Sequence, residues 1–414
     1  MRLTRYSILL LLLVPHLFGA SLSLDGAVEQ FVAHNYDLQI LRHEAQKSRA
    51  DLITAKEHPN PILNGSYEFM DIQHHFGDQA RGSNAQVTFI VAHPFETGGK
   101  REKRVELANH AISYNNLIVD ATVREQLITL INAYYAVLSD QANLTNSQEN
   151  GKMYRTIIAI AKAKLDNGFL TQIDYQKLLL QQIDYTKEIE NNRLALAQDR
   201  ETLAALLALS SSDITVTAPS SFPNEIQPLD SLLANVIDRP DCKAAKQNIA
   251  VADASLKLEK AIAIPNVTIG AEYASFGPYY EPLLGVNFAM PLPVYDKNEG
   301  DIEKARITTL QSSNIYDKTL RMAKSDIIQN YEATQSRQNI YQMMVEGFKS
   351  AQELKEKQEK IFALKGISVL ELLDAQKNYR DYQKNVTQAL VNLHIATARL
   401  KLSSGLSLLD SKGH

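Results

Sequence analysis

The sequence contains a single cysteine, Cys242, and no tryptophan. One thiol excludes an intrachain disulfide and a cysteine-rich metal site, so Cys242 is predicted to be a small buried residue. The formal net charge of −4 over 414 residues is too close to zero to indicate a nucleic-acid-binding protein, and no basic patch is interleaved with aromatic residues. We therefore expect no disulfide scaffold, no thiolate metal centre and no nucleic-acid partner.

Proline is absent after Pro293, although the chain contains 13 prolines. Nothing covalent therefore interrupts a helix in residues 294–414, which are rich in good helix formers. We predict one helix from about Asn298 to about Ala363, roughly 100 Å long at 1.5 Å per residue. A turn near Gly366 then leads into a second, antiparallel helix. A helix of this length has no use in an ordinary globular domain.

Apolar residues follow a helical period along both predicted helices. After the turn the steps alternate between three and four residues, as in a coiled coil. The predicted buried positions are Leu320, Ala323, Ile327, Thr334, Tyr341, Val345 and Phe348 in the first helix, and Tyr379, Tyr382, Val386, Ala389, Leu393, Ala396 and Leu400 in the second.

Long apolar runs are missing except near the start of the chain, where residues 8–14 follow Arg2 and Arg5. Small residues at 19–21 complete the pattern of a secretory signal peptide over residues 1–21. The alternative is an N-terminal anchor helix, but Pro15 leaves the run too short to cross a bilayer. We expect a cleaved signal peptide, and no cysteine follows it that could carry a lipid anchor.

Landmarks in the first half of the chain recur in the second half, roughly 200 residues later. Pro59-Asn60 matches Pro265-Asn266, Phe89 matches Phe288, and Gly168 matches Gly366. The chain is therefore predicted to be one unit of two tandem repeats, 22–209 and 229–406, within a single protomer of residues 22–414. A linker rich in Ser, Thr and Pro, residues 210–228, joins them. Gly151 and Gly347 also match, either as tolerated helix glycines or as designed bends.

Each repeat contains two segments in which apolar and polar residues alternate with the period of a strand. The predicted strands are 62–74, 84–94, 266–276 and 284–293. Their length suits tilted membrane-spanning strands, and four strands from one chain leave open edges that are not viable in lipid. Three copies would close a twelve-stranded barrel. Aromatic residues near the strand ends suit membrane interfaces: Tyr67, Phe69, Phe95, Tyr273, Phe276, Tyr279, Tyr280 and Tyr295. A soluble β-sandwich packed on the helices remains an alternative.

The tandem repeat, the order of elements and the glycine-containing turns before residues 171–174 and 369–371 resemble the outer-membrane efflux (TolC) family. Residues 94–101 (PFETGGKR) and 291–300 (PLPVYDKNEG) resemble the strand-to-helix junctions of its heavy-metal branch, the CzcC-like proteins. Thr97 departs from that pattern, since leucine is common there. The junction residues that carry the resemblance are Pro94, Gly98, Gly99, Lys100, Arg101, Pro293, Asn298 and Gly300.

This resemblance implies a mainly α-helical fold with a membrane β-barrel: a homotrimer whose twelve-stranded barrel sits in outer-membrane lipid and whose helices form a periplasmic α-barrel. It implies a passive exit duct of a tripartite system, docked on an inner-membrane RND-type pump through a periplasmic adaptor (membrane fusion) protein. Resemblance to the heavy-metal branch of the family implies divalent metal cations as the substrate. The alternatives are a general duct for organic toxins or secreted protein, and a soluble periplasmic coiled-coil scaffold.

The two turns are the predicted functional site. By resemblance they form the periplasmic tip that contacts the adaptor, with Gly168, Thr171, Gly366 and Val369 as candidate contact residues. Asp166, Asp174, Glu371 and Asp374 are candidates for an acidic tunnel constriction, because three-fold symmetry would triple each charge. The alternative is that these acids stabilise helix N-termini, since Asp174 and Glu371 lie in predicted first turns.

The remaining polar patterns predict no phosphate-binding, metal-binding or catalytic site. Residues 98–100 (GGK) do not have the spacing of a phosphate-binding loop, and the basic residues around them either meet lipid phosphates or form a solvated charge run. His58, His74, His75 and His93 lack the pattern of a metal site, and tight binding in a duct would slow release. We expect no cofactor, no resident metal and no enzymatic activity.

Overall fold

The computed structural model describes residues 21–69, 85–210, 214–218, 226–276, 281–364 and 368–406. The chain divides into two compact units. Unit 1 comprises the residues up to Tyr36, Arg124–Leu232, and the residues from Ile327 onwards. Unit 2 comprises Asp37–Val123 and Leu233–Asp326. Each unit contains residues from both predicted repeats.

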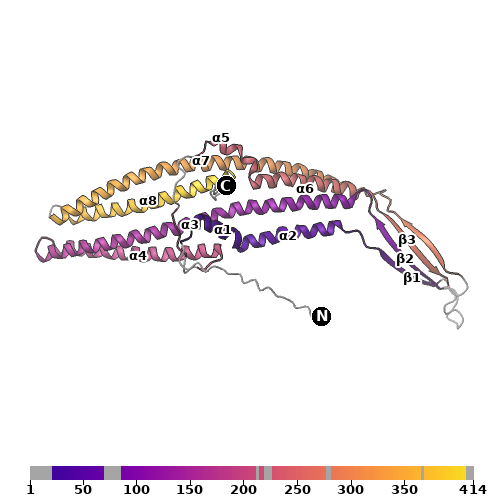
Figure 1. Cartoon of the computed structure of the whole chain (residues 1–414), viewed down its shortest axis with the longest axis horizontal. Helices are drawn as coiled ribbons and strands as arrows, with labels where there is room; N and C mark the ends of the chain where they lie inside the picture. The colour runs from indigo at the N-terminus through magenta and orange to yellow at the C-terminus, as the bar shows by residue number, and fades with distance from the viewer. Residues whose placement is uncertain are drawn as a thin grey trace, which may run out of the picture. The chain divides into compact units, whose positions relative to one another are not determined.

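Unit 1 consists of helices (Figure 1). The C-terminal part of α3 pairs with α4, and the C-terminal part of α7 pairs with α8, as two helical hairpins. The helices that lie wholly or partly in unit 1 are α1 (Leu24–His34), α3 (Lys100–Asp166), α4 (Gln172–Leu207), α5 (Leu229–Ala234), α7 (Glu299–Leu364) and α8 (Val369–Ser403). The N-terminal parts of α3 and α7 belong to unit 2.

The two long helices confirm the prediction drawn from the missing prolines. Helix α3 has 67 residues and α7 has 66, so each extends roughly 100 Å. Ala323, Ile327 and Thr334 are each no more than 1% exposed, as their spacing predicts. Val345 and Tyr382, which we expected to be buried, are 40% and 37% exposed. Tyr382 lies instead against Gly347 on the neighbouring helix.

The two matching helix glycines lie inside continuous helices. A methyl group added at Gly347 would lie 2.4 Å from Cε1 of Tyr382 on α8. A methyl group at Gly151 would lie 3.1 Å from Cδ1 of Ile189 on α4. In both hairpins, therefore, the glycine makes room for a side chain of the returning helix.

Helix α1 is held at the C-terminal end of α4. The Gln30 side chain donates to the Leu207 carbonyl at 3.2 Å, and Asn35 donates to the Leu206 carbonyl at 2.9 Å. The N-cap of this helix is Ser23, whose hydroxyl accepts from the Gly26 N–H at 3.1 Å. Serine preceding the helix satisfies a free amide that Asp25, already inside the first turn, does not reach.

Unit 2 contains the sheet and the helices that lead to it. Four antiparallel strands follow the order β1-β2-β3-β4. The bounds are α2 (Tyr36–Lys56), β1 (Ile62–Phe69), β2 (Ala85–Phe95), η2 (Val236–Asp238), α6 (Pro240–Ile262), β3 (Val267–Ser275) and β4 (Leu283–Ala289). The predicted fold class, mainly α with two strand hairpins, is confirmed.

Strand β4 ends at Ala289, whereas we expected it to continue to Pro293. Pro291 and Pro293 have no N–H to donate, so the ladder with β3 stops before them. The last pair in the register is Thr268 with Ala289.

Among the described residues, we find no helix that combines the length and the hydrophobicity needed to cross a lipid bilayer.

The register brings most of the apolar residues of the four strands onto one face of the sheet. Leu63 pairs with Val91, which pairs with Ala271, which pairs with Val286. This face is exposed in the single chain: Leu284 is 85%, Val286 83% and Phe288 65% exposed. The opposite face has mainly polar and small residues, and there Thr88, Ala92 and Ala274 are buried.

Candidate functional site

The end of the α3–α4 hairpin is a tight turn with a glycine at its centre. Gly168 has φ of +75°, a conformation that favours glycine. The Phe169 N–H returns to the Lys164 carbonyl at 2.8 Å and so closes the end of α3. The Thr171 hydroxyl then caps α4 by accepting from the Asp174 N–H at 3.0 Å. These hydrogen bonds hold the turn in a fixed shape.

The turn at the end of the α7–α8 hairpin is stabilised by a different helix-capping motif. Ser368 and Glu371 form a capping box: the Ser368 hydroxyl accepts from the Glu371 N–H, and the Glu371 carboxylate accepts from the Ser368 N–H, each at 3.3 Å. Gly366, predicted to make this turn, lies outside the described residues. Val369 follows the cap and is only 4% exposed.

The two hairpin ends pack against each other within unit 1. A hydrophobic cluster joins all four helices and contains Tyr154, Ile157, Ala161, Leu178, Tyr185, Phe362, Val369 and Leu372. The Lys164 ammonium donates to the Phe362 carbonyl and lies 4.7 Å from the Phe362 ring centre. Val369, a predicted contact residue, is therefore part of this core and not of the outer surface.

A buried polar layer lies next to this cluster. The Lys355 ammonium sits 4.2 Å from the Tyr379 ring centre and 3.8 Å from the Glu359 carboxylate. The Arg380 guanidinium stacks 4.3 Å over Tyr185 and pairs with Glu188 at 3.2 Å. Burial of charges against aromatic rings and carboxylates requires accurate geometry. This layer therefore fixes the positions of the two hairpins relative to each other within unit 1.

The four predicted acids each bind within their own helix or hairpin. Asp166 pairs with Lys162 at 2.9 Å, and Asp174 pairs with Lys177 at 3.0 Å. The Asn378 amide donates to Asp374 at 3.3 Å, and Glu371 belongs to the capping box. The ammonium of Lys177 and the Thr171 hydroxyl lower the pKa of Asp174. The helix-terminus interpretation thus accounts for Asp174 and Glu371, while Asp166, Glu371 and Asp374 remain exposed to solvent.

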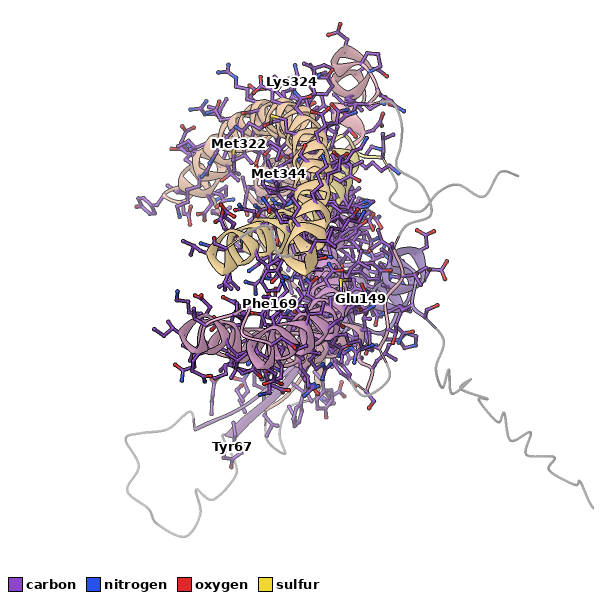
Figure 2. All side chains as sticks on the ribbon, turned by 90° about the vertical axis from the view of Figure 1, so that its left-hand side faces the viewer. Tyr67, Glu149, Phe169, Met322, Lys324 and Met344 are labelled. Atoms are coloured by element: carbon purple, nitrogen blue, oxygen red, sulfur yellow. The ribbon has the colours of Figure 1, made fainter. Side chains whose placement is uncertain are left out.

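Sequence reasoning missed the apolar residues that surround the two turns. Leu364 is 82%, Leu370 72%, Ile173 67% and Phe169 59% exposed. Figure 2 views the hairpin ends and labels Phe169 at the α3–α4 turn. Such a group of exposed apolar side chains at fixed hairpin ends is typical of a protein-binding surface. The available signal was the apolar residues close to each glycine, such as Phe169 after Gly168 and Leu364 before Gly366.

The strand-to-helix junctions are built from contacts inside unit 2. Gly98 has φ of +69°, and a methyl group there would lie 2.8 Å from Cδ1 of Ile264. Thr97 donates its hydroxyl to the Pro265 carbonyl, and Lys100 donates to Asn266 at 2.5 Å. Thr97, the departure from the family pattern, therefore has a partner of its own.

The basic residues of the first junction already have partners. Lys100 is 8% exposed, and its burial lowers its pKa. Arg104 pairs with Glu96 and keeps the pKa of that carboxyl below its usual value, and Arg101 donates to the Lys56 carbonyl at 2.7 Å. The expectation of a lipid-phosphate site or a solvated charge run is thus wrong for Lys100 and Arg104, because both are tied to neighbouring elements.

The second junction depends on Asn298. Its φ is +59°, and its amide donates to the carbonyl and the carboxylate of Glu259 at 2.9 and 2.8 Å. Pro293 ends the segment after β4, and Gly300 has no heavy atom within 4 Å of a built Cβ. Both junctions therefore hold a strand end against the start of a helix through contacts inside unit 2.

Metal-binding residues are not gathered anywhere in the described ranges: no three His, Cys, Asp or Glu side chains come together there in a way that could hold an ion. His93 packs edge-on against Phe95 at 4.8 Å between ring centres. His74 and His75 lie outside the described residues.

Comparison with known families gives one match. The sequence model of a family described as "outer membrane efflux protein" matches residues 27–209 and 231–406. The two matched stretches correspond to the two halves of the chain that repeat one another.

Three curated relatives are similar to this chain. Cobalt-zinc-cadmium resistance protein CzcC of Cupriavidus metallidurans is 21% identical over 70% of this chain and 68% of its own length. Nickel-cobalt-cadmium resistance protein NccC of Alcaligenes xylosoxydans xylosoxydans is 24% identical over 67% of this chain. Fusaric acid resistance protein FusA of Burkholderia cepacia is 22% identical over 66% of this chain. The chain spans 62% of NccC and 55% of FusA.

Solved structures share the fold at low sequence identity. A crystal structure of CusC, described in terms of transmembrane channel formation, has a TM-score of 0.78 at 15% identity and covers 94% of both chains. The CmeC outer membrane channel of Campylobacter jejuni has a TM-score of 0.76 at 13% identity and covers 94% of this chain and 87% of its own.

Proposed function

The chain belongs to the outer membrane efflux protein family, and from that premise we propose that it is the outer-membrane exit duct of a tripartite efflux system. Members of this family are channels and not enzymes. The duct would conduct its substrate passively, from an inner-membrane pump and a periplasmic adaptor to the outside of the cell.

The observation that carries this proposal is the exposed apolar face of the sheet. Leu284, Val286 and Phe288 on β4, and Leu63 on β1, are more than half exposed and share this face with residues of β2 and β3. At about 25 cal/mol per Å², leaving such a surface in water would be costly. Contact with lipid acyl chains removes that cost and supports an outward-facing membrane surface.

The sheet edges support assembly from several copies. Within the described residues β1 pairs only with β2, and β4 pairs only with β3. Each outer edge therefore carries N–H and C=O groups that require partners in a membrane. Three copies would join β4 of one copy to β1 of the next and close a barrel of twelve strands. We propose this homotrimer as the functional assembly, located in the outer membrane after signal-peptide cleavage.

The hairpin ends are the proposed contact site for the adaptor. Phe169, Ile173, Leu364 and Leu370 supply exposed apolar surface, and Gly168 and Thr171 fix the shape of the first turn. Asp166, Asp174, Glu371 and Asp374 remain candidates for an acidic constriction beside this surface. Their roles in capping and pairing do not conflict with it, since a capping carboxylate keeps its negative charge.

Divalent metal cations are the proposed substrate, because two relatives are named for cobalt, zinc, nickel and cadmium resistance. The second candidate is a small organic compound, which the fusaric acid resistance relative favours.

Deletion of the chromosomal copy tests the substrate. We expect the deletion to raise sensitivity to zinc, cobalt, cadmium or nickel several-fold, and the wild-type chain to restore resistance. Unchanged metal tolerance combined with higher sensitivity to fusaric acid would exclude the metal assignment and support the organic one.

Substitution at the hairpin end tests the adaptor surface. Leu370→Glu places a charge within the exposed apolar group, and we expect it to abolish complementation at normal protein levels. Leu209→Glu, an equally drastic change of a 43% exposed leucine after α4, is the matched control and should complement. Equal complementation by both variants would remove the hairpin end from the contact site.

A further inference from the structure

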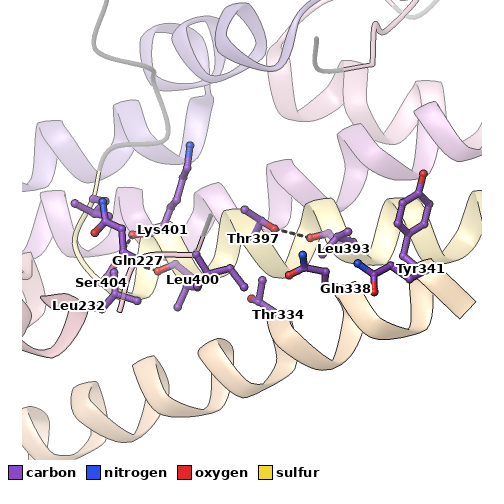
Figure 3. Close-up of a pocket in the computed structure, with 13 residues that line it drawn as sticks. Gln227, Leu232, Thr334, Gln338, Tyr341, Leu393, Thr397, Leu400, Lys401 and Ser404 are labelled. Atoms are coloured by element: carbon purple, nitrogen blue, oxygen red, sulfur yellow. Dashed lines mark hydrogen bonds between the residues drawn. The ribbon is translucent and has the colours of Figure 1, made fainter. Parts of the chain in front are cut away.

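A cavity of about 330 Å³ opens between α7, α8 and the segment that leads into α5 (Figure 3). All of its lining residues belong to unit 1. Its size falls at the lower end of the range for small-molecule pockets, about 300–1,000 Å³. The buried groups below it and the amides around it have different chemistry.

The floor of the cavity is apolar. Leu232, Leu393 and Leu400 are between 2% and 7% exposed. The hydroxyls on the floor are already used: Thr334 donates to the Asn330 carbonyl at 2.7 Å, and Ser404 donates to the Leu400 carbonyl at 2.9 Å. These residues therefore offer mainly methyl and methylene groups to an occupant.

Three side-chain amides line the cavity, those of Gln227, Gln338 and Gln342, and Figure 3 labels the first two. In the part of the chain that the structure describes, none of the three amides makes a hydrogen bond to another residue. Each amide offers two N–H donors and one carbonyl acceptor. The rim is thus prepared for a partner that both donates and accepts hydrogen bonds.

The charge of the lining is low. Among the described residues that line the cavity, Lys401 is the only charged one, and it already takes part in an interaction. A charged occupant would lose hydration without gaining an available counter-charge. A neutral occupant would lose much less hydration free energy.

We propose that this cavity, the α7–α8 pocket, binds a small uncharged amphipathic molecule with an apolar body and an amide or carbonyl head. The apolar body lies on Leu232, Leu393 and Leu400, and the head exchanges hydrogen bonds with Gln338 and its neighbouring amides. Such a molecule contacts two helices and the α5 segment together, so binding stabilises this part of unit 1. This inference goes beyond the duct function and does not depend on which substrate the duct conducts.

Binding of N-butylbenzamide to the purified detergent-solubilised chain tests the proposal. The protein contains no tryptophan, so Tyr341→Trp places a single indole at the pocket wall. We expect saturable quenching or a spectral shift of this indole, one molecule bound per chain by equilibrium dialysis of the wild type, and a rise in melting temperature with ligand concentration. 4-Butylbenzoate, similar in size but charged, should bind at least about tenfold more weakly.

Paired variants distinguish recognition from partition into detergent. Gln338→Leu combined with Gln342→Leu should weaken N-butylbenzamide binding about tenfold, through the loss of hydrogen bonds to the head. Gln335→Leu lies on the same helix outside the pocket and should leave binding unchanged. Non-saturable binding, equal binding in both variants, or tighter binding of 4-butylbenzoate would overturn the proposal. Binding that appears only after removal of residues 407–414 would also overturn it, because the chain itself would then fill the cavity.

Discussion

A pair of carboxyl groups between α3 and α4 shows how single residues set the pH dependence of this protein. Burial, together with the neighbouring Asp199 carboxyl, raises the pKa of Asp140 to about 6. One carboxylate oxygen of Asp140 is enclosed and has no hydrogen-bond partner among the described residues. An ionised Asp140 is therefore disfavoured in the folded chain.

The sign of the pH effect follows from the two pKa values of Asp140. In the unfolded chain its pKa is about 4, so between about pH 4 and pH 6 the folded chain holds a proton that the unfolded chain has released. The contribution of Asp140 to stability is therefore fully present below about pH 4 and is lost as the pH rises through about 6. We predict that Asp140→Asn raises the melting temperature near pH 8 and leaves it unchanged near pH 4.

Thermal unfolding of the detergent-solubilised protein measures this difference. Asp184→Asn, at an exposed position of α4, is the control and should show no gain at either pH. A gain for Asp140→Asn of equal size at both pH values would refute the titration of Asp140 as its cause.

Gly98 gives a second prediction for a single residue. Alanine at Gly98 would combine a φ of +69° with a contact of 2.8 Å to Ile264 Cδ1 and of 3.1 Å to the Ala261 carbonyl. We expect Gly98→Ala to destabilise the chain by about 2 kcal/mol and to lower the melting temperature accordingly. Gly300→Ala is the matched control in α7, where a Cβ meets nothing within 4 Å, and it should be neutral or slightly stabilising. Equal melting temperatures for the two variants would contradict the strain at Gly98.

Single residues were predictable from sequence where local chemistry decides them. The positive φ of Gly168 follows from a glycine after a helical period, and Asp174 and Glu371 follow from their place in a first turn. Tyr382 and Lys100 were not predictable in this way. Their positions depend on Gly347 and Asn266, and no spacing rule reveals a partner on another element.

At the scale of elements, the end of each helical hairpin is set by its cap. Ser368 and Glu371 satisfy two backbone amides at the start of α8, and Val369 and Leu372 then enter the hydrophobic cluster. We predict that Ser368→Ala costs about 1 kcal/mol locally and speeds amide hydrogen exchange at Glu371 roughly fivefold. Exchange at Asp174, which the separate Thr171 cap protects, serves as the internal standard.

A further variant separates the hydrogen bond of the capping box from the negative charge of Glu371. Glu371→Gln keeps an acceptor for the Ser368 N–H but removes the negative charge from the first turn. Slow exchange at residue 371 in both Ser368→Ala and Glu371→Gln would show that the cap does not hold this end of α8.

The helices and strands themselves were mostly predictable from their hydrophobic period and from the positions of proline. Absence of proline predicted α7 and α8, and the period of two predicted the strands. The end of β4 was misjudged because the apolar alternation continues to Pro293, whereas hydrogen bonding, which the alternation does not report, stops at Ala289.

At the scale of the whole molecule, the two faces of the sheet predict different tolerance to charge. Val286 lies on the exposed apolar face and Asn287 on the opposite face of the same strand. We predict that Val286→Arg blocks membrane insertion, since arginine on a lipid face costs about 2–4 kcal/mol, and that Asn287→Arg inserts normally.

Detergent extraction of membranes and the oligomeric state of the extract measure this prediction. The wild type and Asn287→Arg should leave the membrane only with detergent and sediment as trimers. Release of the wild type by carbonate alone, as a monomer, would favour the soluble scaffold over the proposed duct.

The fold class was predictable from the tandem repeat, because duplication of a strand–helix unit constrains the whole chain. The division into units that mix both repeats was not predictable. It depends on packing between segments far apart in sequence, such as Lys257 with Glu106 at 2.7 Å.

The outer edges of β1 and β4, which have no partner strand within the described residues, have a genetic consequence. In the proposed trimer each copy pairs its two edge strands with two other copies. A copy with a mutated edge strand therefore prevents closure of the barrel that it joins. If intact and damaged copies are made in equal amounts and mix freely, only about one ring in eight is wholly intact. Edge mutations in this protein should therefore be dominant over the normal allele, whereas mutations that prevent a copy from folding should be recessive.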